Sequence, residues 1–494
     1  MTHVTSTSLI SRRTMLKATG AVGTVGTFGV GTTLLAPPAS AAGSGYAHPG
    51  LLHTGADLSR MKSKVKAGAA PYTAGYARLT ANRHAQSGWT PNPQASITRG
   101  GTGQNYAILY NDIHAAYQNG LRFHVSGDGA HADTAVAILN AWSARLTTLA
   151  GNADRFLAAG LYGYQIANAA ELVRDHPDFE LDRFREMLSG VFALLSDSFL
   201  VKHNDAVVSN YWTNWDLAAM SCVLATGIFC DDKAQVGRAV DYFKHGEGLG
   251  SIRNAIPVVH DDGLAEWLEA GRDQGHALLG VGLMGTFCEM AWNQGIDLYG
   301  YDDSRFLKGA QYVAKWSMGG EVPFTANTRA KGAVNGWSGS ETVAGAAGVD
   351  PAMTRPIWAM IANHYTKRRG VSASYLTRIA AKSGPEGGGG DYGPNSGGYD
   401  QLGFGTLAFT RDRSTASASP SATASGAASD PRPQTGSSAS ASASASATPA
   451  SGKDLAATGS TDVVAWSATA GITAVAGGLL LLRRRDKVRR GTAE

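Results

Sequence analysis

The stretch Glu269-Ala-Gly-Arg-Asp-Gln-Gly-His276 opens a long apolar segment and decides how the fold is interpreted. If a helix begins near Gly271, Arg272 and His276 are four residues apart and share one face at its N-terminal end. A cation and a proton-transfer group would then project from one rim, which suits chemistry on an anionic substrate. The alternative is that both side chains only complete a hydrogen-bond network at the helix start. The apolar residues that continue the helix are Leu279, Leu283 and Phe287.

Helical periodicity dominates residues 46–412, which hold nearly all of the aromatic residues. Paired antiparallel helices of similar length predict a mostly all-α domain, an (α/α) toroid or incomplete barrel. Strand-like alternation is scarce, and one short strand is expected at 404–409. The expected helices span roughly 105–120, 130–150, 155–175, 179–197, 210–230, 233–244, 264–294, 303–317, 352–368 and 371–382.

Polar residues gather at the starts of four of these helices. If alternate helices form the inner ring of a toroid, they run parallel and their N-terminal ends meet at one mouth. The convergence predicts a binding site, whereas any one of these residues alone is better explained as a helix cap or packing residue. The residues expected there are Tyr164, Gln165 and Asn168, then Tyr211, Trp212, Asn214 and Trp215, then Glu269, Arg272, Gln274 and His276, and finally Arg355.

The N-terminal segment, residues 1–41, has the pattern of a twin-arginine export signal. Ser11-Arg12-Arg13-Thr14-Met15-Leu16-Lys17 precedes a stretch rich in glycine, alanine, valine and threonine, and Ala39-Ser40-Ala41 follows as a small-residue cleavage site. We therefore expect the twin-arginine translocase as a partner and a mature chain that begins near Ala42.

The C-terminal segment, residues 455–494, resembles a cell-wall sorting signal of the LAxTG type. Leu455-Ala-Ala-Thr-Gly459 precedes an apolar run, 463–482, and a basic tail, 483–490. This order predicts cleavage after Thr458, with sortase and peptidoglycan as partners, at the cell wall surface of a Gram-positive, actinobacterial-type bacterium. The alternative is a permanent transmembrane helix, because the run is long enough to span a bilayer and the basic tail fits the cytoplasmic side.

Between the helical domain and the sorting signal, residues 413–454 are rich in serine, alanine, threonine and proline. This composition predicts a disordered stalk, because it holds too little apolar surface to form a core. The formal net charge of +4 becomes about −2 once the two terminal segments, each carrying +3, are removed. Such a chain lacks the basic field that nucleic acid requires, so no nucleic-acid partner is expected.

The three cysteines lie in apolar helical stretches and are expected in the core. Cys222, Cys230 and Cys288 are too few and too widely spaced for a disulfide framework or a zinc site. We expect no metal and no other cofactor.

Five motifs spread over most of the helical domain carry a family resemblance: 164–171 (YQIANAAE), 214–220 (NWDLAAM), 269–276 (EAGRDQGH), 297–301 (DLYGY) and 387–398 (GGGGDYGPNSGG). They resemble the alginate-lyase-domain proteins, in particular polysaccharide lyase family 38. The resemblance implies an (α/α) toroid that cleaves uronic-acid polysaccharides by β-elimination. It also implies that Asn214 and Arg272 neutralise the substrate carboxylate and that His276 transfers a proton.

The tyrosine that completes this set in related lyases has no counterpart inside the Arg272 motif. Tyr299 and Tyr301 follow a helix of some twenty residues and should lie ~30 Å away, at the opposite rim. Tyr211 and Tyr164 both belong to helix starts on the expected active face, so the proton donor is predicted to be one of these two.

Elimination needs these residue types. Removal of the C5 proton of a uronate builds a dianionic enolate, which an amide donor and a guanidinium on the carboxylate would stabilise. His276 could take the C5 proton, and a tyrosine hydroxyl could protonate the O4 leaving group.

Two other functions fit parts of the sequence. A glycoside hydrolase on a similar toroid would use a carboxyl pair such as Asp216 with Glu269 or Asp273. However, Asp216 lies two residues beyond Asn214 and should point well around the helix. A non-catalytic, wall-anchored glycan-binding protein would stack sugars on tryptophans such as Trp212, Trp215 and Trp337.

Overall fold

The computed structural model describes residues 45–388, 390 and 399–413. The predicted export signal, the stalk and the sorting signal lie outside these residues, as does most of the glycine-rich motif at 387–398. Within the described part of the chain, no helix has both the length and the apolar character needed to cross a membrane.

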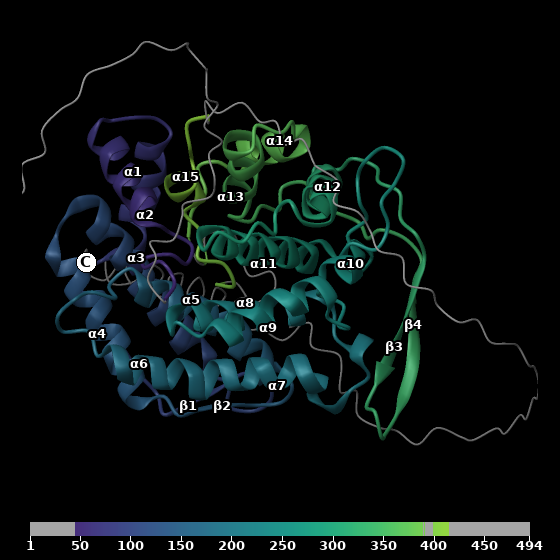
Figure 1. Ribbon diagram of the computed structural model, residues 1–494, viewed down its shortest axis with the longest axis horizontal. Coiled ribbons are helices and arrows are strands. Elements are labelled where there is room, and N and C mark those ends of the chain that lie inside the picture. The colour runs from purple at the N-terminus through teal and green to yellow at the C-terminus, as the bar shows by residue number, and fades with distance from the viewer. Residues whose placement is uncertain (1–44, 389, 391–398, 414–494) are drawn as a thin grey trace, which may run out of the picture. The chain divides into compact units, whose positions relative to one another are not determined.

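The described domain is mostly helical, and five helices form its inner layer (Figure 1). Along this layer α3 packs on α5, α5 on α8, α8 on α11 and α11 on α13. Every residue of α8 is buried and nearly every residue of α11, so these helices are enclosed on all sides. Their bounds are α3 (Tyr106–Ser126), α5 (Asp154–Glu171), α8 (Thr213–Phe229), α11 (Gln274–Asn293) and α13 (Trp358–Asn363).

An outer layer of helices returns the chain between successive inner helices. Each is antiparallel to the inner helix that it follows, so the inner helices all begin at the same end, as an (α/α) toroid requires. The predicted fold class is confirmed. The outer helices include α4 (Gly129–Arg145), α6 (Leu181–Met187) with its continuation α7 (Leu194–Lys202), α9 (Lys233–His245), α12 (Tyr301–Ser317) and α14 (Ser374–Ser383).

The closest inner contact lies between α5 and α8, where Gly160 faces Ala218. A Cβ atom placed on Gly160 would lie 2.6 Å from the Ala218 carbonyl carbon, so any larger residue would push the two helices apart. The inner helices therefore meet backbone against backbone, and the positions of their first residues are fixed relative to one another.

Several elements differ from the sequence-based expectation. The helix expected over 264–294 is a 3₁₀ turn, η5 (Leu268–Gly271), followed by α11, because Asp273 caps the helix three residues before His276. The strand expected at 404–409 is wrong: this segment forms α15 (Gly405–Ala408), whose first residue packs against Ala359 and Glu386.

Several further elements were not predicted from the sequence. They are α1 (Gly55–Lys66), α2 (Tyr72–Ala81), α10 (Ile252–Ala255), the paired short strands β1 (Ser96–Thr98) and β2 (Thr148–Ala150), and the antiparallel hairpin of β3 (Asn327–Gly332) and β4 (Ser338–Val343). In Figure 1 the hairpin lies at the edge of the helical body.

A buried carboxyl group lies at the start of α13. Glu386 Oε1 accepts hydrogen bonds from the backbone N–H groups of Trp358 and Ala359, both at 2.8 Å. Burial raises the pKa of Glu386 to about 7, although these two hydrogen bonds oppose the shift. The folded protein therefore holds this proton at pH values where the unfolded chain has released it.

This pKa predicts how stability depends on pH. A carboxyl group whose pKa is raised by folding contributes its full stability below the unfolded value of 4.5 and loses it as the pH rises towards 7. Glu386→Gln keeps the oxygen that accepts both hydrogen bonds and removes the titration. We expect the melting temperature of the variant to vary less than that of the wild type between pH 5 and about pH 8. If the melting temperatures of the variant and the wild type changed equally with pH, this assignment would be contradicted.

Candidate active site at the start of α11

His276 and Asp273 form a pair at the start of α11. Asp273 Oδ1 accepts from the backbone N–H of His276 at 2.8 Å, and Asp273 Oδ2 lies 2.7 Å from His276 Nδ1. Burial of Asp273 is outweighed by these hydrogen bonds and by the nearby positive charges, so its pKa is lowered to about 2. An ionised carboxylate can only accept, so in the neutral imidazole Nδ1 carries the proton and Nε2 presents its lone pair. Nε2 has no hydrogen-bond partner among the described residues, and the side chain is 18% exposed.

Arg272 lies in the turn before α11 rather than on it. The expectation that Arg272 and His276 share a helix face is therefore wrong, but Asp273 brings them together, with its Oδ2 3.6 Å from Arg272 Nε. Arg272 Nη1 also donates to Glu269 Oε1 at 3.0 Å. Thr213, the first residue of α8, donates to the other oxygen of Glu269. Glu269 is fully buried, which raises its pKa against the opposing charge of Arg272, and it binds α8 to the η5 turn.

Trp212 lies against two guanidinium groups. The Arg272 guanidinium carbon is 5.6 Å from the centre of the indole, and that of Arg329, on β3, is 4.1 Å away. Arg329 was not predicted from the sequence. Its own donors are satisfied by Glu341 Oε2 at 2.7 Å and by the carbonyl of Ser209 at 3.0 Å. The indole and both cations are thus held in place from two sides.

Asn214 is the second residue of α8 and is buried. Its side-chain amide makes no hydrogen bond to another described residue, and Oδ1 is a buried oxygen without a partner. A buried polar group without a partner costs free energy, which a ligand at the mouth could recover.

Tyr211 is held in an aromatic group next to Asn214. Its ring packs on Trp215 and Phe199, with ring centres 4.6 and 5.0 Å away, and Asn204 donates to its hydroxyl at 3.0 Å. Burial raises the pKa of Tyr211. The structure contains no direct contact between Tyr211 and Arg272 or His276 among the described residues.

Most of the residues expected to bind substrate form hydrogen bonds with other parts of the protein. Tyr164 donates to the Asp400 carbonyl at 2.6 Å, and Gln165 donates to the Tyr399 carbonyl at 3.1 Å. Asn168 accepts from the backbone N–H of Leu52 at 2.9 Å. Sequence patterns could not reveal this, because the partners are far away along the chain: more than 200 residues for Tyr164 and Gln165, and 116 residues for Asn168.

Two further predicted residues anchor loops. The side-chain amide of Gln274 bonds to both backbone groups of Asp350, at 2.8 and 3.1 Å. Arg355 is buried in an ion pair with Asp400 and also donates to the Gly275 carbonyl at 3.4 Å. Gln274 therefore binds the backbone of Asp350 to the start of α11, and Arg355 binds Asp400 to it.

Asp216, the carboxylate that a hydrolase would need, is fully buried. Its oxygens accept from His203 at 2.9 Å, Tyr242 at 2.9 Å and the backbone N–H of Gly250 at 3.0 Å. It links α8 to the outer helices, as expected for a side chain that points around the helix from Asn214.

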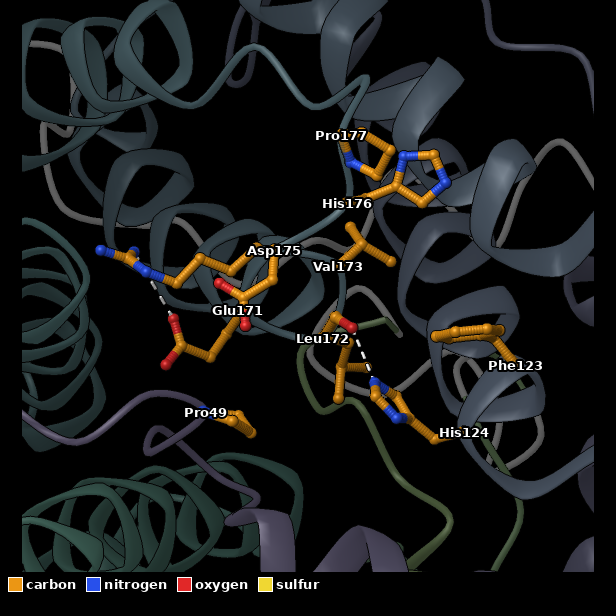
Figure 2. Close-up of a pocket in the computed structure, with 10 residues that line it drawn as sticks. Pro49, Phe123, His124, Glu171, Leu172, Val173, Asp175, His176 and Pro177 are labelled. Carbon is orange, nitrogen blue, oxygen red and sulfur yellow. Dashed lines mark hydrogen bonds and ion pairs between the residues drawn. The ribbon is translucent and has the colours of Figure 1, made fainter. Parts of the chain in front are cut away.

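A cavity of about 300 Å³ lies at the other end of the inner helices. Figure 2 shows residues that line it. It is lined by residues of the last turns of α3 and α5, among them Phe123, His124 and Glu171. Because α5 rises about 1.5 Å per residue, this cavity lies roughly 25 Å from the α5 start. None of the predicted catalytic residues lines it.

Comparisons with known proteins place the chain in a family. The alginate lyase family model matches residues 63–324, more than half of the chain and a range that includes Asn214, Arg272 and His276. The chain belongs to the alginate lyase family and is thus a polysaccharide lyase. A search of curated proteins found no match.

Solved structures that resemble this chain are also alginate lyases. An alginate lyase from Bacteroides ovatus has 16% identity and a TM-score of 0.43, with 55% of this chain and 83% of that chain covered. Alginate lyase A1-III from Sphingomonas species A1 has 14% identity and a TM-score of 0.46, with 72% and 95% covered. A form of A1-III complexed with a tetrasaccharide has 15% identity and a TM-score of 0.45, with the same shares covered.

Proposed function

We propose that this polysaccharide lyase cleaves uronic-acid-containing polysaccharide, of the alginate or glucuronan type, by β-elimination at the start of α11. The observation that carries the proposal is the Asp273–His276 pair, which leaves Nε2 unpartnered among the described residues and adjoins the Arg272 guanidinium. Family membership supplies the reaction class.

The roles of the residues follow from the chemistry. Arg272 pairs with the uronate carboxylate and Asn214 donates to it, so that the charge developing on removal of the C5 proton is dispersed. His276 Nε2 takes that proton. The C4–O4 bond breaks as the C4–C5 double bond forms, and the leaving O4 receives a proton.

Tyr211 is the proposed proton donor to O4. Tyr164 is not retained, because its hydroxyl is fully buried and already donates to the Asp400 carbonyl. Tyr211 lies three residues from Asn214 at the start of α8, and its raised pKa keeps the hydroxyl protonated until it is needed.

The direct experiment is to incubate the purified domain with alginate, polymannuronate, polyguluronate and glucuronan. Elimination leaves an unsaturated sugar at each new non-reducing end, which ultraviolet absorbance and mass spectrometry detect. Products without a double bond would show hydrolysis instead, and no product from any uronan would reject the proposal.

Removal of any one of the three central groups should nearly abolish turnover. We expect Asn214→Ala, Arg272→Ala and His276→Ala each to lower kcat by ~10² or more on the best uronan. Circular dichroism should show that the fold persists. Asp216→Asn serves as the contrast, because it should lower the melting temperature while the remaining folded enzyme still forms unsaturated products. Near wild-type turnover of His276→Ala would contradict the role of the base.

Asp273→Asn tests the positioning of His276 separately from helix capping. Asparagine still accepts the backbone hydrogen bond at the helix start but loses the charge that sets the imidazole tautomer. We expect kcat to fall by ~10-fold or more, with KM and melting temperature nearly unchanged. An unchanged kcat would show that Asp273 only caps the helix.

We further propose that the enzyme is exported through the twin-arginine pathway and anchored to peptidoglycan at the cell wall of a Gram-positive bacterium. The support is the sequence of residues 1–41 and 455–494. Thr458→Ala should leave the protein in the membrane fraction or release it, whereas the wild type should need a wall hydrolase for release. Extraction of the intact wild type by boiling detergent would favour a transmembrane anchor.

A further inference from the structure

The β3–β4 hairpin is fastened to the segment that leads into α8. Asn210 Oδ1 accepts from the backbone N–H of Gly332 at 2.8 Å, and Gly332 in turn accepts from the N–H of Val207 at 3.0 Å. Val334 in the turn donates to the Asp205 carbonyl at 3.0 Å. The hairpin is therefore a fixed extension of the site rather than a loose loop.

One face of the hairpin is turned towards the site. Side chains alternate along each strand, so the partners Arg329 and Glu341 share a face with Lys331. Arg329 on this face lies over Trp212. Val343 and Phe324 occupy the space where a side chain on Gly271 would lie, so the strand that carries Glu341 also lies on the η5 turn.

The same face continues to an exposed tryptophan. The Trp337 carbonyl accepts a hydrogen bond from the Ala333 N–H at 3.0 Å. Trp337, Gly339 and Glu341 are every second residue, so they lie on the same face. Its side chain is 65% exposed. A Cβ on Gly339 would lie 3.2 Å from the indole, so the absence of a side chain there lets the ring lie across the strand.

We propose that this face of the hairpin is a distal substrate subsite, in which Trp337 stacks on a sugar ring and Lys331 attracts a uronate carboxylate. The inference rests on the proposed uronan substrate. Flat aromatic faces bind the apolar faces of sugar rings. Lys331 lies on the same face of the hairpin, with its Nζ 3.9 Å from Glu341 Oε1, and its charge selects for an anionic sugar. Arg329 and Ala333 are four positions apart, which is roughly 13 Å along a strand, so the bound sugar lies beyond the residue being cleaved.

The test compares long and short substrates. For Trp337→Ala we expect kcat/KM on polymeric uronan to fall about 3- to 10-fold through KM, with kcat unchanged. On the shortest cleavable oligosaccharide the two enzymes should be equal, because that substrate does not reach the hairpin. Trp337→Phe should recover part of the loss, and Gly339→Val should reproduce it by displacing the indole. Lys331→Ala should weaken polymer binding most at low salt.

Val334→Ala is the matched control, since this apolar side chain lies in the same turn and is 59% exposed. It should behave as the wild type on all substrates. Equal kinetics of Trp337→Ala and wild type on polymer would overturn the subsite while leaving the proposed reaction intact. An equal loss on polymer and on the shortest oligosaccharide would overturn it too. Absence of unsaturated products from the wild type would instead reject the proposed function.

Discussion

A buried ion network near the C-terminal end of α11 holds distant parts of the helical domain together. Glu289, near the end of α11, pairs with Arg368 at 2.8 Å and with Arg411 at 3.5 Å. Arg411 also pairs with Asp57 of α1 at 2.7 Å, so the first and last described segments meet on one inner helix. Burial alone would raise the pKa of Glu289, but the guanidinium groups and His364 lower it well below the usual range. Removing one partner would leave a buried charge uncompensated, which is strongly destabilising.

The candidate active site lies at the opposite end of α11, where the helix begins. The first residues of α5, α8 and α11 lie at the positive ends of three helix dipoles. Arg272 and Arg329 add full charges there, although the mature chain is expected to be slightly acidic. Attraction for an anionic polymer is thus local, and it needs no basic surface elsewhere on the molecule.

The sequence predicts the inner helices well and the outer features poorly, for physical reasons. α8 and α11 are apolar on every side, so their pattern is strong, and Cys222 and Cys288 lie buried within them as expected. The β3–β4 hairpin has polar residues on both faces, so it shows no clear alternation. The helix α1 was missed although it is amphipathic, with Leu58 and Met61 buried on one face. The prediction correctly placed Arg272 and His276 close together, but for the wrong reason. They do not share a helix face; Asp273, which caps α11, contacts both of them.

The distribution of hydrogen bonds at the mouth explains why elimination fits better than hydrolysis. Hydrolysis of a glycosidic bond requires two carboxyl groups that face the substrate. Here Glu269 binds Thr213 and Arg272, Asp273 binds His276, and Asp216 binds three partners in the interior. Each nominated carboxylate holds another group in place. Among the described residues, the groups left without protein partners include the Asn214 amide and the Nε2 atom of His276. An amide donor and a neutral base are the groups that removal of a proton next to a carboxylate requires.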